Sequence, residues 1–181
     1  MPNLNNRFDI KSFLDKIAQI ESSGGKNFAH REIASGIQAG DRGIGRYGLM
    51  PNTVREIAHR EAMAGKIDPD IIAAAQLPSD QMKQQLETNP EIEQKLAESL
   101  GHHLQSKFPG DEERMAYGWT MGHNIPTGNI NDEDLNNSNY VNKFRRVSEL
   151  MKNKQDIENI KEKPLQSSMG DVRLVDKSIK E

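Results

Sequence analysis

The feature that most constrains this chain is a helical spacing of apolar residues that recurs in one segment after another. Apolar residues three or four positions apart occur in about seven segments, a spacing that places them on one face of an α-helix. Clusters of Pro, Gly, Asn and Asp separate the segments and favour turns and helix ends. The predicted helices span residues 10–23, 51–64, 70–76, 80–88, 90–108, 112–121 and 138–153. The sequence therefore predicts an all-α fold of about seven short helices.

One domain is predicted, followed by a polar tail. The 181 residues are enough to bury a single core. We predict a domain over residues 8–153 and a weakly held tail over 154–181, because Lys, Glu, Gln and Ser dominate from Lys154 onward. A docking segment for a partner is the alternative role of this tail.

Residues 26–50 interrupt the helical pattern. They contain glycines at positions 36, 40, 43, 45 and 48 and show no clean alternation, so at most a short ribbon or an ordered loop is predicted. A long irregular segment in a small domain usually has a function, and a surface loop is the alternative.

Composition and charge exclude several classes of function. The formal net charge of −3 provides no general attraction for nucleic acid, and there is no cysteine for a disulfide or a thiolate metal site. The adjacent His102 and His103 would point about 100° apart on a helix, so they cannot bind one ion together. No metal, cofactor or nucleic-acid partner is therefore predicted.

No stretch has the features of a membrane span or a signal peptide. The apolar runs are far shorter than a bilayer requires, and the first residues contain no apolar signal core. If the substrate lies outside the cytoplasm, we expect a route other than a cleaved leader; the localisation itself stays open.

The carboxyl of Glu21 stands out because it prolongs an apolar helix face. Ile17 precedes it by four residues and Leu14 by seven, so the three side chains share one side of the first helix. Burial and the C-terminal end of the helix dipole both disfavour the anion, so we expect a raised pKa, which suits a general acid. The alternative is an exposed carboxyl without a function at a fraying helix end.

Four short motifs follow one another along the chain. They are Glu21-Ser22-Ser23-Gly24, Gly-Arg-Tyr-Gly-Leu-Met-Pro-Asn-Thr at 45–53, Ala-Tyr-Gly-Trp-Thr at 116–120, and Tyr140-Val141. In order and spacing they resemble the E-S-x-G, G-L-M-Q-x-M-P-x-T, A-Y-N-A-G and Y-V motifs of the lytic transglycosylases. Each motif alone is weak, but the ordered set is specific and covers roughly residues 10–150. The resemblance implies a lysozyme-like, peptidoglycan-cleaving domain.

The resemblance also implies a reaction. Glu21 would be the single general acid/base, protonating the leaving oxygen between N-acetylmuramic acid and N-acetylglucosamine. The 6-hydroxyl of the muramic acid would attack its own C1 and leave a 1,6-anhydro end. Glu32 and Asp41 are candidate second carboxylates. If either reached the anomeric face, water would be activated instead, as in the goose-type lysozymes.

Six residues are implied for substrate binding: Tyr47, Leu49, Met50, Tyr117, Trp119 and Tyr140. We favour a binding role for Tyr47, because an aromatic residue in a Gly-rich segment has little core to join. The hydroxyl of Tyr117 is expected near Glu21, with a core tyrosine as the alternative. Trp119 could stack on a sugar ring, but it follows Met115 by four residues, which favours a core position.

Two departures from the family pattern favour a second class of function. Gly48 and Gly118 stand where the family often has Gln and Asn, so two amides that could bind an acetamido group are missing. A glycan-binding or virion-structural module that has lost turnover is therefore the alternative to an enzyme. Delivery by a phage particle, a phage lysis system or a secretion apparatus, with the tail as the binding segment, would suit either class. Residues 68–88 look like an insertion relative to the minimal domain.

Overall fold

The computed structural model describes residues 8–27, 43–66, 68–121 and 130–162, and all of its regular elements in these ranges are helices. The helices are α1 (Ile10–Ser22), α2 (Pro51–Met63), α3 (Pro69–Gln76), α4 (Ser79–Thr88), α5 (Pro90–Lys107), α6 (Glu112–Met121), α7 (Asp132–Asn137) and α8 (Asn139–Glu162). The predicted all-α class is thus confirmed, and every predicted helix is present.

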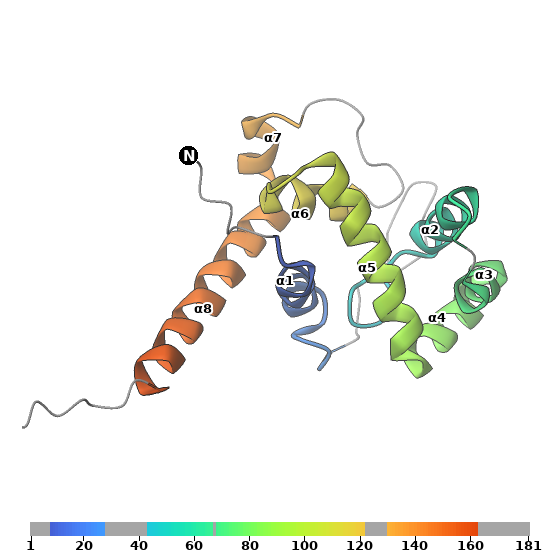
Figure 1. The fold of residues 1–181 in the computed structure, drawn as a ribbon, viewed down its shortest axis with the longest axis horizontal. Coiled ribbons are helices and arrows are strands. Elements are labelled where there is room, and N and C mark those ends of the chain that lie inside the picture. Colours follow the sequence, from blue (N-terminus) through green and yellow to red (C-terminus); the bar gives the residue numbers. More distant parts are fainter. Residues whose placement is uncertain (1–7, 28–42, 67, 122–129, 163–181) are drawn as a thin grey trace, which may run out of the picture.

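Helix α1 lies between α5 and α8, and it provides the centre of the core (Figure 1). Asp9 caps its N-terminus by accepting a hydrogen bond from the backbone N–H of Lys11, as its residue type predicts. The Phe13 ring lies 5.7 Å from the ring of Phe144 on α8 and 6.1 Å from that of Trp119 on α6, measured between centroids. These aromatic contacts join α1, α6 and α8 into one unit.

Helices α2, α3 and α4 pack at the other end of α5, on the right of Figure 1. Residues 68–88, which resemble an insertion in the sequence, form α3 and α4 and contribute buried side chains to the main core. These are Ile71, Ala74, Met82 and Leu86. The segment is therefore part of the domain core.

The structure corrects the sequence-based prediction at two helices. The last helix does not end at Asn153 but continues to Glu162, because no Pro or Gly interrupts a run of good helix formers before Pro164. Residues 152–159 are exposed. Helix α7 was not predicted, since Leu135 is its only apolar residue; a capping box between Asn131 and Asp134 begins it.

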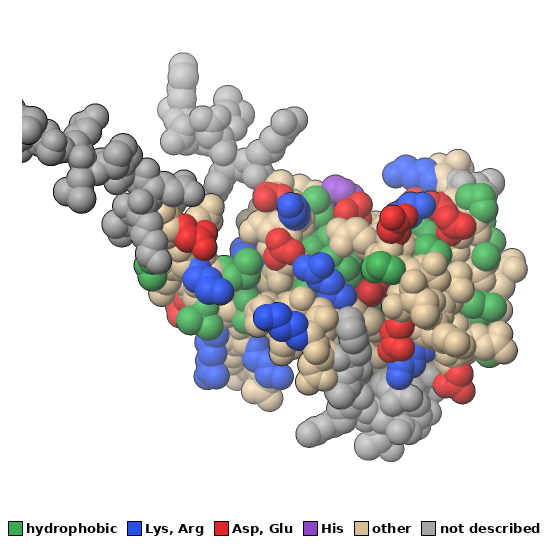
Figure 2. Space-filling model, turned by 90° about the horizontal axis from the view of Figure 1, so that it is seen from below, with side chains coloured by type: hydrophobic (Ala, Val, Ile, Leu, Met, Phe, Trp, Pro, Cys, Tyr) green, Lys and Arg blue, Asp and Glu red, His purple; other side chains and the backbone are tan. Residues whose placement is uncertain are grey.

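The surface of the described residues is polar and mixed in charge. Figure 2 shows acidic and basic side chains interspersed over one face, consistent with the small net charge. No helix in the described ranges is long and apolar enough to cross a bilayer.

Candidate functional site around Glu21

The centre of the candidate site is a tight turn formed by residues 44–49, which we call the 44–49 turn. Its ends are joined by an isolated antiparallel bridge in which Ile44 and Leu49 exchange backbone hydrogen bonds of 2.9 and 3.1 Å. Gly45 and Gly48 adopt φ angles of +67° and +63°, where only glycine is free of strain. The sequence predicted at most a short ribbon or an ordered loop over residues 26–50. In the part of this segment that the structure describes, the pairing consists of this one bridge.

Glu21 lies in the last turn of α1, half-buried, with its carboxyl against the backbone of Gly48. A Cβ atom at Gly48 would approach Glu21 Oε2 to 2.4 Å and Glu21 Cδ to 2.8 Å, so no side chain fits there without displacing the carboxyl. The glycine that departs from the family pattern is therefore the residue that the position of Glu21 requires.

The hydroxyl of Tyr140, in the first turn of α8, is buried near Glu21. Burial contributes most to raising the pKa of Tyr140 well above its usual value, and the charge and hydrogen bonding of Glu21 add to the effect. The structure thus brings together Glu21, Gly48 and Tyr140, from three segments far apart in the sequence.

Ser22, the residue after Glu21, fixes the end of α1 to the 44–49 turn. Its hydroxyl donates a hydrogen bond of 2.7 Å to the carbonyl oxygen of Arg46 and accepts one of 2.8 Å from the backbone N–H of Gly25. The serine is buried, so water does not compete for these bonds. Ser22 therefore positions the helix end that carries Glu21.

Glu93 on α5 lies on the other side of the same turn, with only 3% of its surface exposed. Its Oε1 accepts a hydrogen bond of 2.8 Å from the backbone N–H of Tyr47, and a Cβ atom at Gly45 would lie 2.5 Å from its carboxyl carbon. Burial raises the pKa of Glu93 to about 7, against the opposing effect of hydrogen bonds from the Tyr47 and Arg46 backbone.

The sequence analysis missed Glu93, although a signal was present. Leu96, Ala97 and Leu100 follow Glu93 by three, four and seven residues, so this carboxyl prolongs an apolar face as Glu21 does. The same criterion that selected Glu21 would have selected both residues.

Tyr47 is a core residue, although its place in a Gly-rich segment led us to favour a sugar-binding role. Only 2% of its surface is exposed, and its hydroxyl donates a hydrogen bond to Gln94 on α5. Its backbone carbonyl accepts a hydrogen bond of 3.3 Å from the indole Nε1 of Trp119. A ring buried in this way has no face open to stack on a sugar.

The remaining predicted binding residues lie in different surroundings. Trp119 is buried, which confirms the core position that its spacing favours, and Leu49 is buried in the same main core. Met50 is half-buried and precedes α2. Tyr117 is half-buried and packs against a second cluster of Ile130, Leu135 and Val141. The binding roles of Leu49, Met50, Tyr117, Trp119 and Tyr140 remain predictions.

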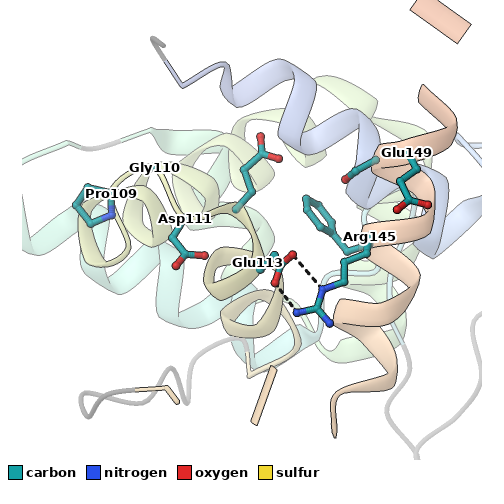
Figure 3. Close-up of a pocket in the computed structure, with 9 residues that line it drawn as sticks. Pro109, Gly110, Asp111, Glu113, Arg145 and Glu149 are labelled. Carbon is teal, nitrogen blue, oxygen red and sulfur yellow. Dashed lines mark hydrogen bonds and ion pairs between the residues drawn. The ribbon is translucent and has the colours of Figure 1, made fainter. Parts of the chain in front are cut away.

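A separate cavity of about 610 Å³ lies between the start of α6 and the middle of α8 (Figure 3). The Arg145 guanidinium donates two hydrogen bonds, of 3.0 and 2.6 Å, to the two carboxyl oxygens of Glu113. This ion pair fixes α8 to α6. Arg145 therefore helps to orient α8, the helix that carries Tyr140.

No group of three or more His, Asp or Glu side chains in the described ranges is arranged to hold a metal ion. The candidate second carboxylates, Glu32 and Asp41, lie outside the described residues. Comparisons of the chain with protein-family models, curated proteins and solved structures found no match. The family resemblance therefore rests on the four motifs.

Proposed function

We propose that this protein is a peptidoglycan lytic transglycosylase with a lysozyme-like fold and with Glu21 as its single general acid/base. The observation that supports the proposal most is the position of Glu21. Glu21 is half-buried at a helix end, and its carboxyl lies against the backbone of Gly48 and near the buried hydroxyl of Tyr140. A carboxyl held by packing, but still partly accessible, can give a proton to a bound substrate and take one back.

The proposed reaction needs one carboxyl and no water. Glu21 protonates the glycosidic oxygen that leaves with N-acetylglucosamine, and the bond from that oxygen to C1 of N-acetylmuramic acid breaks. The 6-hydroxyl oxygen of the same muramic acid bonds to C1, and its proton passes to the Glu21 carboxylate. The enzyme returns to its starting state, and the product carries a 1,6-anhydro ring.

Tyr140 supports this cycle as a hydrogen-bond donor. With its pKa raised, the phenol stays protonated throughout the pH range in which the protein would work. It can therefore stabilise the Glu21 carboxylate that forms when the proton leaves.

Digestion of purified peptidoglycan, with mass analysis of the products, tests the proposal. We expect anhydro-muramyl ends, which are lighter than reducing ends by one water. Reducing ends would instead indicate a goose-type hydrolase, with Asp41 and Glu32 the first residues to replace. Glycan binding without any product from the wild-type protein would favour the binding or virion-structural module.

The departures at Gly48 and Gly118 bear on that alternative. At Gly48, the Glu21 carboxyl occupies the space of a side chain, so the position that carries an amide in the family is here used to seat Glu21. Gly118 is buried on α6, and nothing among the described residues explains why glycine stands there. We further propose a delivery route through a phage particle or a secretion apparatus, with the chain after Asn153 as the segment that a partner binds.

A further inference from the structure

Three helices hold the backbone of the 44–49 turn by hydrogen bonds, and the Trp119 indole N–H of α6 binds the Tyr47 carbonyl oxygen. On the α1 side, the Ser22 hydroxyl binds the Arg46 carbonyl oxygen. On the α5 side, the Glu93 carboxyl binds the Tyr47 N–H and fills the space beside Gly45. A shift of the turn would move Gly48, and Glu21 is seated against Gly48.

A cavity lies on the side of the turn that faces α5, among the described residues. Its volume is about 250 Å³, and it is lined by Gly24, Gly25, Arg46, Tyr47, Glu87, Pro90, Glu93 and Gln94. The Glu93 carboxyl blocks a movement of Gly45 toward α5, but the cavity beside it leaves the turn room to shift. The hydrogen bond from Tyr47 to Glu93 is a directional contact that opposes this movement.

We propose that Glu93 is a positioning residue of the Glu21 site, which acts by holding the 44–49 turn through the Tyr47 N–H. The inference rests on the proposed function and extends it to a residue that does not touch the substrate. Arg46 and Glu87 are the charged groups that act on Glu93 across this space, from the turn and from α4. The feature needed for positioning is an acceptor at Oε1, whatever the charge of the carboxyl.

A matched pair of variants separates positioning from mere filling of space. Glu93→Gln and Glu93→Met are both uncharged and similar in length, but only the glutamine can accept the hydrogen bond from Tyr47. We expect Glu93→Gln to cleave soluble glycan fragments within a few-fold of wild type. In Glu93→Met, kcat should fall by up to about 10²-fold with little change in KM, as expected for a misplaced catalytic group. The assays should run at a temperature where circular dichroism shows both variants folded.

Trp119 provides a readout that does not depend on activity. It is the only tryptophan in the chain, and its indole N–H binds the Tyr47 carbonyl oxygen. Its fluorescence maximum should be the same in wild type and Glu93→Gln, and it should shift in Glu93→Met because the turn has moved.

The outcomes separate the two proposals. If Glu93→Met and Glu93→Gln have the same Trp119 emission and, where cleavage occurs, the same kcat, Glu93 has no positioning role. If the wild type cleaves nothing but the emission shifts only in Glu93→Met, the proposed function fails and the positioning of the turn stands.

Discussion

Glu21 and Glu93 are two carboxyl groups on opposite sides of one turn, and each lies against a glycine with a positive φ angle. A Cβ atom would approach the carboxyl to 2.4 Å at Gly48 and to 2.5 Å at Gly45. Both residues prolong the apolar face of their helix. They differ in access, because Glu21 is half-buried at a helix end whereas Glu93 is 3% exposed in the first turns of α5.

Under the proposed function, this difference in access is what separates the catalytic role of Glu21 from the positioning role of Glu93. A buried carboxyl that already accepts backbone hydrogen bonds can hold a turn, but it cannot meet a polysaccharide. A partly exposed carboxyl seated on bare backbone can do so. An apolar helix face that ends in Glu therefore predicts a carboxyl held in place by packing. The exposure of that carboxyl in the folded protein determines whether it can contact a substrate.

The largest effect should come from exchanging the reactive carboxyl alone. Glu21→Gln keeps shape and burial but cannot cycle a proton, so cleavage should fall by about 10²–10⁴-fold while glycan binding remains. Zymography and a pull-down with insoluble peptidoglycan measure the two properties. Glu133→Gln, which replaces an exposed carboxyl in the first turn of α7, is a control that should cleave normally. Near-wild-type cleavage by Glu21→Gln would remove Glu21 from the mechanism.

The second effect concerns the pH dependence of stability, which should come from Glu93. The pKa of its carboxyl is raised from 4.5 to about 7 in the folded protein, so the folded state holds this proton more tightly than the unfolded state. The stability due to Glu93 is then present below pH 4.5 and is lost as the pH rises to about 7, by about 3 kcal/mol at most.

Urea unfolding of wild type and Glu93→Gln at pH 5 and pH 8 tests this sign. The glutamine cannot titrate, so the variant should gain stability relative to wild type between the two values. Equal changes in both proteins would show that Glu93 titrates as it does in the unfolded chain.

A smaller effect should distinguish the two glycines. Gly48→Ala and Gly45→Ala both place a Cβ in the left-handed region, which costs about 1–2 kcal/mol each. Gly48→Ala should in addition displace Glu21, whereas Gly45→Ala should displace Glu93, which does not touch the substrate. Gly48→Ala should therefore lose more cleavage than Gly45→Ala. Equal losses of cleavage would mean that the seat of Glu21 does not depend on the backbone of Gly48.

The smallest effect should follow truncation after Asn153. The helix residues beyond it are exposed through Glu158 and Asn159, far along α8 from the turn that carries Tyr140. Thermal stability and cleavage should both stay near wild type, since little apolar surface is lost. A large drop in melting temperature would show that the tail docks on the domain.

The sequence by itself determined the helices, because apolar spacing and Pro, Gly, Asn and Asp are local signals. It located Glu21 in the same way, from the residues four and seven positions before it. The end of α8 was predicted too early, because its last residues are polar although they favour a helix. Helix α7 was not predicted, because a capping box and not an apolar face begins it.

Only the tertiary structure decided which of these residues meet. Tyr47 lies in the core because α5 and α6 close over the 44–49 turn, and no local pattern in a Gly-rich segment encodes that burial. Tyr140 reaches Glu21 because α8 packs on α1, more than a hundred residues later in the chain. The need for glycine at position 48 has the same origin, since the space for its side chain is taken by a carboxyl from another helix. Contacts between distant segments depend on how helices pack, and packing is set by the whole core at once.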